Sequence, residues 1–168
     1  MYKFPDMNIE YRNLLPDESK VYRKIRLESL EKFPEAFGTA YKDALKTEKF
    51  RIESDIEHQT LERFVFGAFT NGLLVGICAF VKDENNAGNI YQMYIQQDYQ
   101  GKRMGQGLIE AVLNEAYKRF NDIEITLGVT SRNSKAYNLY RKIGFRDITN
   151  STSNGSACSI VMKHTKNT

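Results

Sequence analysis

The chain of 168 residues contains little of the material from which metal centres, disulfide frameworks and membrane spans are built. Its two cysteines, Cys78 and Cys158, lie in runs of apolar or small residues, which favours buried free thiols. Its two histidines, His58 and His164, share no ligand spacing with them, so we expect no metal site. No apolar run is long enough to cross a bilayer, and the first residues lack the apolar centre of a signal peptide. We therefore expect a cytoplasmic protein that does not act at a membrane.

Charge of one sign is not concentrated in any part of the chain. The 24 Lys and Arg residues are interspersed with 21 Asp and Glu residues, and the net charge is +3. Such a surface permits one anion site but does not favour nucleic-acid binding. The hydrophobic fraction of 41% is that of a globular protein, and the length fits one substantial core. We expect a single domain over residues 1–168.

Apolar periodicity and turn signals predict a mixed α/β fold. The segment RFVFGAFTNGLLVGICAFVKD contains two apolar runs joined at Asn71-Gly72, the pair favoured in tight hairpin turns. The other expected elements are a strand over 8–14, helices over about 17–32 and 38–57 with a break near Thr47, a strand over 89–96, an amphipathic helix ending near Phe120, a strand over 123–129, a helix over 133–142, a turn at Gly144-Phe145 and a closing strand over 156–164.

The stretch QGKRMGQGLI (100–109) reads as a glycine-bearing loop that feeds the N-terminus of a helix. Free backbone N–H groups and the helix dipole make such a place an anion site, and Lys102 and Arg103 add positive charge. The alternative is an ordinary helix entry with glycines for a tight turn. The phosphate-loop pattern GxxxxGK[ST] is absent, and Glu110 stands where a dinucleotide fingerprint needs a third small residue.

A second motif, NSKAYNLYRKIGF (133–145), follows the strand at 123–129. The order strand, QGKRMGQG loop, amphipathic helix, strand and NSKAYNLYRKIGF is similar to the acetyl-CoA-binding core of the GCN5-related N-acetyltransferase (GNAT) superfamily. The resemblance is dense over 89–147, and RLESLEKFPEAFGTAY (26–41) looks like the leading helices of many bacterial members. It implies a mixed, mostly antiparallel sheet with splayed central strands flanked by helices, acetyl-CoA as cosubstrate, and acceptor-side helices over about 17–57.

The resemblance also assigns a binding role to individual positions. In the family, main-chain groups of the loop hold the coenzyme A pyrophosphate, main-chain groups of the strand MYI (93–95) pair with the pantetheine, and an asparagine matching Asn133 contacts the cofactor or caps its helix. Arg103 replaces the first glycine of the family pattern, a departure that is tolerable only if Arg103 adopts the local conformation without a positive φ. The binding groups are main-chain N–H groups, which any residue but proline supplies, so the site need not be lost. The implied cofactor-binding residues are Met93, Tyr94, Ile95, Gln100, Gly101, Lys102, Arg103, Met104, Gly105, Gln106, Asn133 and Tyr140.

Two catalytic roles are implied in the same way. Tyr140 matches the family tyrosine that protonates the departing thiolate, although a core aromatic at helical spacing would explain it as well. The backbone N–H of Tyr94 is expected to hydrogen-bond the acetyl carbonyl and its developing oxyanion. The strand over 89–96 has no carboxylate to serve as a base, and neither Glu84 in the preceding loop nor Glu28 on the first helix is a good substitute. A water relay is the working hypothesis.

The resulting hypothesis is an acetyl-CoA-dependent N-acetyltransferase acting on a primary amine of a small molecule or peptide. The alternatives are a coenzyme A-binding module of the same fold that has lost catalysis, and a pyrophosphate- or nucleotide-binding regulator that uses the same loop. Many family members are dimers, so a homodimer is compatible with the resemblance. The acceptor side has Tyr22, Arg26, Phe33, Phe37 and Tyr41 available, although core packing explains most of them equally well.

Overall fold

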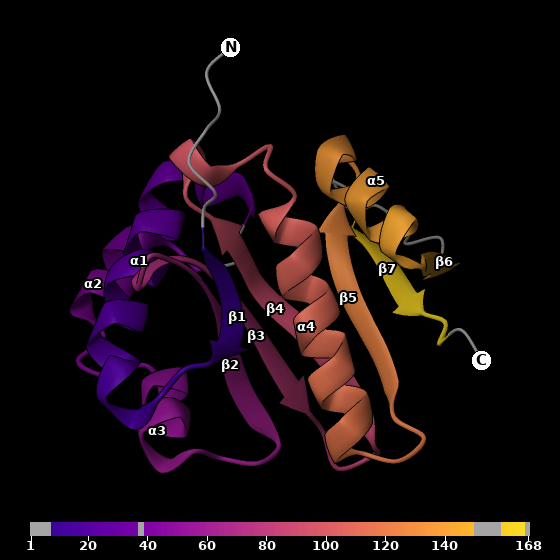
Figure 1. Ribbon diagram of the computed structural model, residues 1–168. Helices are drawn as coiled ribbons and strands as arrows, with labels where there is room; N and C mark the ends of the chain where they lie inside the picture. Colours follow the sequence, from indigo (N-terminus) through magenta and orange to yellow (C-terminus); the bar gives the residue numbers. More distant parts are fainter. Residues whose placement is uncertain (1–7, 37–38, 150–158, 167–168) are drawn as a thin grey trace.

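Seven strands form one open sheet in the order β1-β2-β3-β4-β5-β7-β6 (Figure 1). The computed structural model describes residues 8–36, 39–149 and 159–166. Within these residues every neighbouring pair of strands is antiparallel except β4 and β5, which run parallel. The strands are β1 (Ile9–Asn13), β2 (Arg63–Thr70), β3 (Leu73–Lys82), β4 (Ala87–Ile95), β5 (Glu124–Thr130), β6 (Phe145–Thr149) and β7 (Ser159–His164).

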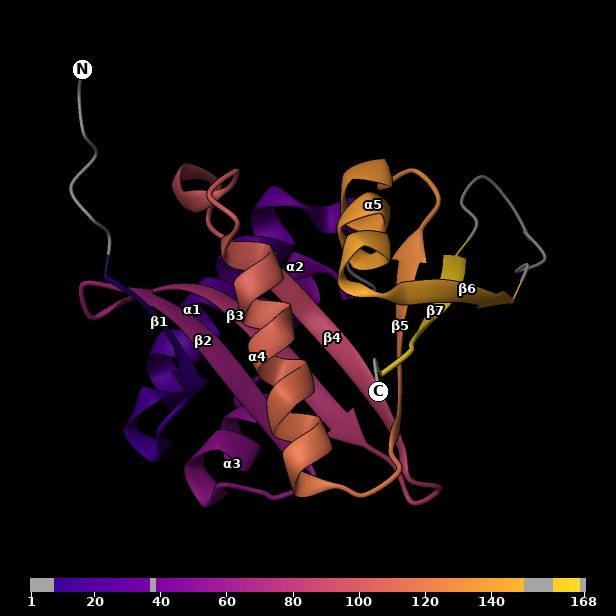
Figure 2. The ribbon, with the colours of Figure 1, turned by 45° about the vertical axis from the view of Figure 1, so that its right-hand side comes forward.

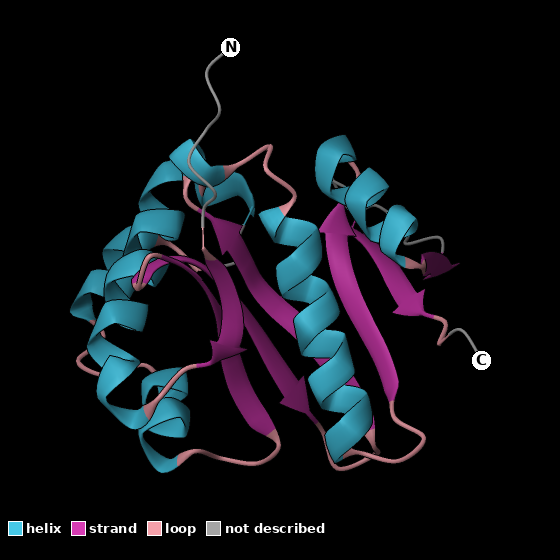
Figure 3. Ribbon diagram, viewed as in Figure 1, coloured by secondary structure: helices cyan, strands magenta, loops and turns pink. Residues whose placement is uncertain are grey.

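Helices cover both faces of the sheet and divide the core into two layers (Figures 2 and 3). One face carries α1 (Ser19–Lys32), α2 (Tyr41–Lys46) and α3 (Arg51–His58), and the other carries α4 (Met104–Arg119) and α5 (Ser134–Ile143). Short 3-10 turns occupy Pro16–Glu18, Pro34–Ala36 and Gln97–Tyr99. Because each helix buries one apolar stripe on the sheet, polar groups that could bind a ligand are expected where helices and strands end.

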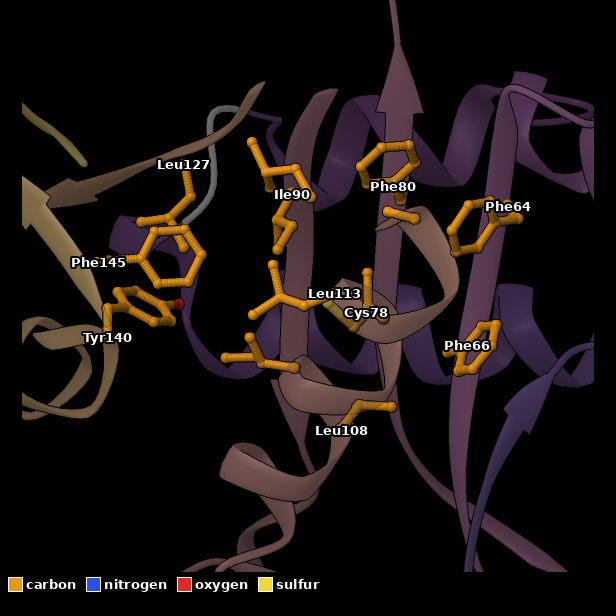
Figure 4. Close-up of a cluster of buried hydrophobic side chains, with 14 of the residues drawn as sticks. Phe64, Phe66, Cys78, Phe80, Ile90, Leu108, Leu113, Leu127, Tyr140 and Phe145 are labelled. Carbon is orange, nitrogen blue, oxygen red and sulfur yellow. The ribbon is translucent and has the colours of Figure 1, made fainter. Parts of the chain in front are cut away.

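The larger apolar cluster lies between the sheet and the α4/α5 layer (Figure 4). Its aromatic centre is a series of stacked rings in which Phe80 lies 4.9 Å from Phe64 and 6.1 Å from Phe120. Tyr140 and Phe145 extend the cluster from α5 and β6, with ring centroids 6.0 Å apart. The smaller cluster joins the α1 and α3 face to β2, β3 and β4. The two clusters hold the helices against the sheet from opposite sides.

The hairpin predicted at Asn71-Gly72 is confirmed. Both residues have a positive φ, 50° and 81°, as the tightest β-hairpin turns require. The predicted helical region over 38–57 forms as α2 and α3, with the break at Thr47 where it was expected. The prediction of a mixed, mostly antiparallel sheet flanked by helices is also confirmed.

The sequence-based account missed one strand. Residues following Gly144 were expected to form only a turn, but Phe145–Thr149 forms β6, which pairs with β7 at the edge of the sheet. Gly144 has a φ of 123° and ends α5, so it does supply the turn. The closing strand begins at Ser159, and residues 156–158 of the predicted strand lie outside the described residues.

Of the two cysteines, only Cys78 lies within the described residues. Cys78 is a free thiol with no exposed surface, as predicted, and burial raises its pKa to about 12. Cys158 lies outside the described residues.

Candidate functional site

The centre of the site is the place where β4 and β5 separate. These parallel strands pair from Ala87–Glu124 to Ile90–Leu127 and no further. On the other side of β4, the register with β3 shifts between Ile77 and Ala79, so that β4 contains a bulge. Gln92 in this bulge has a φ of 56°, a conformation that non-glycine residues rarely adopt. The bulge and the loss of pairing leave the C-terminal half of β4 open toward β5.

The loop between β4 and α4 places backbone N–H groups at this opening. The first backbone bond of α4 runs from the Gly107 N–H to the Arg103 carbonyl at 3.2 Å, and no side chain caps the helix start. The N–H groups of residues 104–106 are therefore free of helical partners, as in the first turn of any helix. Gln100 fixes the loop by donating from Nε2 to the Ile95 carbonyl at 2.8 Å. Free N–H groups at the start of a helix suit an anion, so these features are compatible with the predicted anion site, which stays a prediction.

The conformation of Arg103 contradicts the condition set by the sequence analysis. Its φ is 62° and its ψ is 14°, so a bulky residue occupies the left-handed region that the family glycine would adopt without strain. A left-handed conformation costs an L-residue about 1–2 kcal/mol. The side chain of Arg103 is exposed, so it packs against none of the core while the backbone holds this conformation. The loop thus keeps its shape despite the substitution.

Glycine at the first turn of α4 serves close packing. Gly107 faces the ring of Tyr11 on β1, and any Cβ at position 107 would collide with that ring. Gly105 has a looser environment, because an added Cβ would lie 3.3 Å from Met93 Cε and 3.4 Å from Leu139 Cδ2. These contacts bring the start of α4 directly over the sheet, close to the bulge of β4.

The predicted cofactor-binding residues gather around one cavity of about 590 Å³, on the α4/α5 side of the opening. Eleven of the twelve line it, namely Met93, Tyr94, Ile95, Gln100, Gly101, Arg103, Met104, Gly105, Gln106, Asn133 and Tyr140. Lys102 does not; its ammonium lies 5.5 Å from the ring of Tyr99. Lys135 and Lys142, which the sequence analysis did not single out, also line the cavity. With Arg103 they give it three cationic side chains, and none of the described residues adds a carboxylate.

A second cavity of about 810 Å³ opens toward α1, α3 and the loop that precedes α3. Three residues line both cavities: Met93, Asn133 and Tyr140. Asn133 also caps α5, since its Oδ1 accepts from the Ala136 N–H at 3.2 Å. The cap keeps Asn133 in place at the opening between β4 and β5. The two cavities are therefore neighbours at the opening between β4 and β5, where these three residues line both.

Tyr140 is one of the three shared residues. Its ring is 91% buried, and its hydroxyl forms no hydrogen bond with a group in the described part of the chain. Burial raises the pKa of Tyr140, and the nearby Cys78 sulfur raises it further. Figure 4 shows Tyr140 beside Phe145, with its hydroxyl oxygen directed toward the middle of the cluster. The phenol is thus held neutral, with its proton available to a group placed in either cavity.

The acceptor-side candidates separate into different places. Tyr22 and Arg26 line the larger cavity, and Phe33 lines the smaller one. Tyr41 begins α2 and lines neither, and Phe37 lies outside the described residues. Tyr22 donates to Gln92 Oε1 at 2.6 Å, which ties α1 to the bulge of β4. Burial raises the pKa of Tyr22, so this donor stays protonated.

The two carboxylates considered as bases lie apart from both cavities. Glu28 on α1 accepts hydrogen bonds from Tyr94 Oη at 2.6 Å and from Gln96 Nε2 at 3.2 Å. Burial and the contact with Glu28 raise the pKa of the Tyr94 phenol, so Tyr94 remains the donor. Glu84 is exposed in the loop between β3 and β4. Neither carboxylate lines the opening.

Within residues 8–36, 39–149 and 159–166, which the structure describes, neither a group of metal ligands nor a membrane-spanning helix is present. No three His, Cys, Asp or Glu side chains there are grouped to hold a metal ion. None of the helices in these ranges is long and apolar enough to cross a membrane.

Comparison with known proteins shows the same core elsewhere. A model of the acetyltransferase (GNAT) family matches residues 23–145. A search of curated protein sequences finds no match. Among solved structures, a GNAT-family acetyltransferase from Streptococcus pneumoniae is 20% identical with a TM-score of 0.76, covering 93% of this chain and 98% of its own.

Two other similar structures contain the cofactor. PaiA N-acetyltransferase from Thermoplasma acidophilum, in complex with coenzyme A, is 21% identical with a TM-score of 0.75, covering 95% of this chain and 100% of its own. YncA, a putative acetyltransferase from Salmonella typhimurium with acetyl-CoA, is 17% identical with a TM-score of 0.72, covering 93% of this chain and 92% of its own. At these identities the similarity shows a shared fold and nothing finer.

Proposed function

We propose, because the chain belongs to the acetyltransferase (GNAT) family, that it transfers an acetyl group from acetyl-CoA to a primary amine of a small molecule or peptide. One observation carries this proposal: two neighbouring cavities share Tyr140, Met93 and Asn133 in their linings. A donor in one cavity and an acceptor in the other would bring their reacting groups together beside these residues. Such positioning is itself a large part of catalysis for a two-substrate reaction.

The smaller cavity suits the coenzyme. The free N–H groups of residues 104–106 and the positive end of the α4 dipole would receive the pyrophosphate. Arg103, Lys135 and Lys142 add cations around it, which favours a ligand with several phosphate charges. The opened half of β4 offers main-chain groups to the pantetheine amides, much as a sheet edge receives an added strand. The acetyl group would then lie beside Met93 and Tyr140.

The transfer requires one bond to form and one to break. The neutral amine nitrogen attacks the thioester carbonyl carbon, and the backbone N–H of Tyr94 stabilises the oxyanion. The carbon–sulfur bond then breaks, and the departing thiolate takes the proton of the Tyr140 hydroxyl. Burial raises the pKa of the Tyr140 phenol, so the phenol is protonated when the thiolate forms and can act as its proton donor. The nitrogen, which became positively charged on attack, loses its extra proton to solvent as the amide forms, and solvent returns a proton to the tyrosine.

Deprotonation of the amine is assigned to water. None of the described residues lining either cavity is an Asp or Glu, so a carboxylate base would have to act from outside the lining. The lining of the larger cavity includes four cations, and positive charge nearby lowers the pKa of a bound ammonium. A water chain can then remove the proton without a dedicated base.

A second candidate function is coenzyme A binding without catalysis. It is favoured by the strained Arg103 in the loop and by the lack of a lining carboxylate. Nucleotide binding by the same loop is a third outcome, because a pyrophosphate is common to both ligands.

The test has two stages. Isothermal titration with acetyl-CoA, coenzyme A and ATP is expected to show binding of the first two and not of ATP. A thiol-release assay over amino acids, polyamines, aminoglycosides and peptides then measures turnover. Tyr140→Phe should lower kcat by about 100-fold or more while leaving acetyl-CoA affinity nearly unchanged, since general acid catalysis contributes about that much. Wild-type turnover in this variant would remove Tyr140 from the mechanism, and binding without turnover would favour the second candidate.

A further inference from the structure

The larger cavity has charge of one sign only. Its lining includes the cations Arg26, Lys49, Arg51 and Arg63, and no carboxylate of the described residues. These cations come from three separate parts of the chain: α1, the start of α3 with the loop before it, and β2. The excess is local, because the chain as a whole carries nearly balanced charge. A cavity with such a lining attracts anions and repels cations.

Two of the four cations are held in place by carboxylates that lie behind the lining. Arg63 Nε is 2.7 Å from Asp55 Oδ2, and Lys49 Nζ is 2.7 Å from Glu57 Oε1. These ion pairs reduce the charge that the two cations present to the cavity. Arg51 differs, since it is exposed at the first position of α3 and forms no ion pair within the described part of the chain. Arg51 is thus a cation at the mouth of the cavity.

Arg26 is the deepest of the four. Its side chain is only 7% exposed, beside Tyr22 and with Nη1 3.5 Å from Ser29 Oγ. Burial lowers the pKa of Arg26, although a guanidinium remains charged at neutral pH. Its charge therefore adds to the positive potential inside the cavity. Arg26 thus lies in the depth of the cavity and Arg51 at its mouth.

We propose that the acceptor amine also carries an anionic group, a carboxylate or a phosphate, which this cationic lining attracts and which contacts Arg51 while the amine reaches Tyr140. This inference rests on the proposed acetyl transfer, because it names the class of acceptor for that reaction. It excludes polyamines and aminoglycosides, whose several ammonium groups would meet the repulsion of the whole lining. Amino acids, acidic peptides and amino phosphates fit it.

The same charge distribution explains the missing base. An acceptor that is anchored through its anionic group brings its ammonium into a region of positive potential, where its pKa falls. The anchor therefore secures binding, and the surrounding cations favour the neutral, nucleophilic form of the amine. A polycation would also have the pKa of its amine lowered, but it has no anionic group through which it could bind.

Matched pairs of amines give the direct test. We would compare β-alanine with β-alaninamide, L-phenylalanine with L-phenylalaninamide, and phosphoethanolamine with ethanolamine, together with spermidine. Each kcat/KM is divided by the fraction of amine that is neutral at the assay pH, because an anionic group changes the amine pKa. We expect the anionic member of at least one pair to exceed its neutral partner by about ten-fold, as for a charge-assisted contact in a desolvated site. The phosphate pair and the carboxylate pairs identify which anion is used.

Variants assign the preference to the cavity. Arg51→Ala should lower the anionic-to-neutral ratio about five-fold while acetyl-CoA affinity, measured by titration, stays as in the wild type. Lys118→Ala removes the same charge from an exposed position of α4 outside both cavities, and it should leave the ratio unchanged. Arg26→Gln should reduce the ratio further. Because Arg26 is buried, the melting temperature of this variant is measured as well, to check that it folds. Arg51→Ala decides the test if Arg26→Gln does not fold.

The results separate this inference from the function on which it rests. Neutral amines or spermidine used as well as the anionic partners would overturn the inference and leave acetyl transfer intact. A ratio unaffected by Arg51→Ala would also overturn the assignment to this cavity. If acetyl-CoA binds but no amine is acetylated, the melting temperature of the protein is measured with each amine of the same pairs in the presence of coenzyme A. Equal shifts in melting temperature for the anionic and the neutral member of every pair would overturn the inference. Failure to bind acetyl-CoA would refute the proposed function, and the inference with it.

Discussion

Replacing Arg103 by glycine should have opposite effects on stability and on cofactor affinity. Arg103 has a φ of 62°, a conformation that costs a non-glycine residue about 1–2 kcal/mol. Glycine removes that cost but loses about 0.5–1 kcal/mol through the greater freedom of the unfolded chain. The net gain in the free energy of unfolding is therefore about 0.5–1 kcal/mol. For a chain of this length it corresponds to a rise of about 2 °C in Tm.

The same change removes a cation from the cofactor cavity. Arg103 lines that cavity but is exposed to solvent, so its contact with a phosphate is worth at most about 1 kcal/mol. We expect the Kd for coenzyme A to rise about five-fold. Because the backbone N–H groups of residues 104–106 remain, binding should weaken without being lost.

Arg103→Ala separates the two effects. Alanine removes the charge but keeps the Cβ that makes the left-handed conformation costly, so it should weaken coenzyme A binding as much as glycine does and should not stabilise the fold. Denaturant unfolding and isothermal titration on the two variants measure both quantities. The reasoning is refuted if glycine is no more stable than alanine. An unchanged Kd in both variants would show that the side chain has no part in binding.

Three further changes test other parts of the account. With Cys158 replaced by serine, Cys78 should not react with a thiol reagent at pH 8 until the protein unfolds. The reason is that Cys78 is fully buried and its pKa is raised to about 12. Rapid labelling of the native protein would be inconsistent with that burial. Phe80→Ala should lower the free energy of unfolding by about 3–5 kcal/mol, since it opens the middle of the stacked rings, and a loss below 1 kcal/mol would contradict that packing. Arg12 donates to Glu18 at 2.7 and 2.9 Å and lowers its pKa, so the stability that the pair provides is present above the ordinary carboxyl pKa and lost as pH falls through the folded value. Glu18→Gln should therefore be less stable than the wild type at pH 7, with a difference that shrinks below about pH 4.5, and a constant difference would refute the linkage.

Local sequence signals were sufficient for most of the fold. The turn at Asn71-Gly72 has its own chemical signature, and the helix that starts at Met104 has a regular apolar face, so neither depends on distant parts of the chain. The strand β6 has no such signal, because FRDIT is short and is defined by its pairing with β7. Edge strands of this kind depend on a neighbour that the local sequence does not reveal.

The candidate site could be predicted in its residues but not in its geometry. The resemblance supplied Tyr140 and the loop, yet the positive φ angles of Gln92 and Arg103 occur at residue types that do not ordinarily indicate them. The cationic cavity was also missed, because Arg26, Arg51 and its other cations are far apart in sequence and come together only in the folded chain. The proposed acceptor preference therefore rests on the folded arrangement and could not be inferred from the sequence.

The central claim is that this chain moves an acetyl group from acetyl-CoA to an amine. Its most direct test is mass spectrometry of a reaction that contains the protein, acetyl-CoA and the amine panel, with free thiol measured in the same sample. The account predicts an amine product heavier by one acetyl group, formed in equal amount to the released coenzyme A, and its near-complete loss in Tyr140→Phe. Thiol release without any acetylated amine, or acetylation at the same rate in Tyr140→Phe, would contradict it.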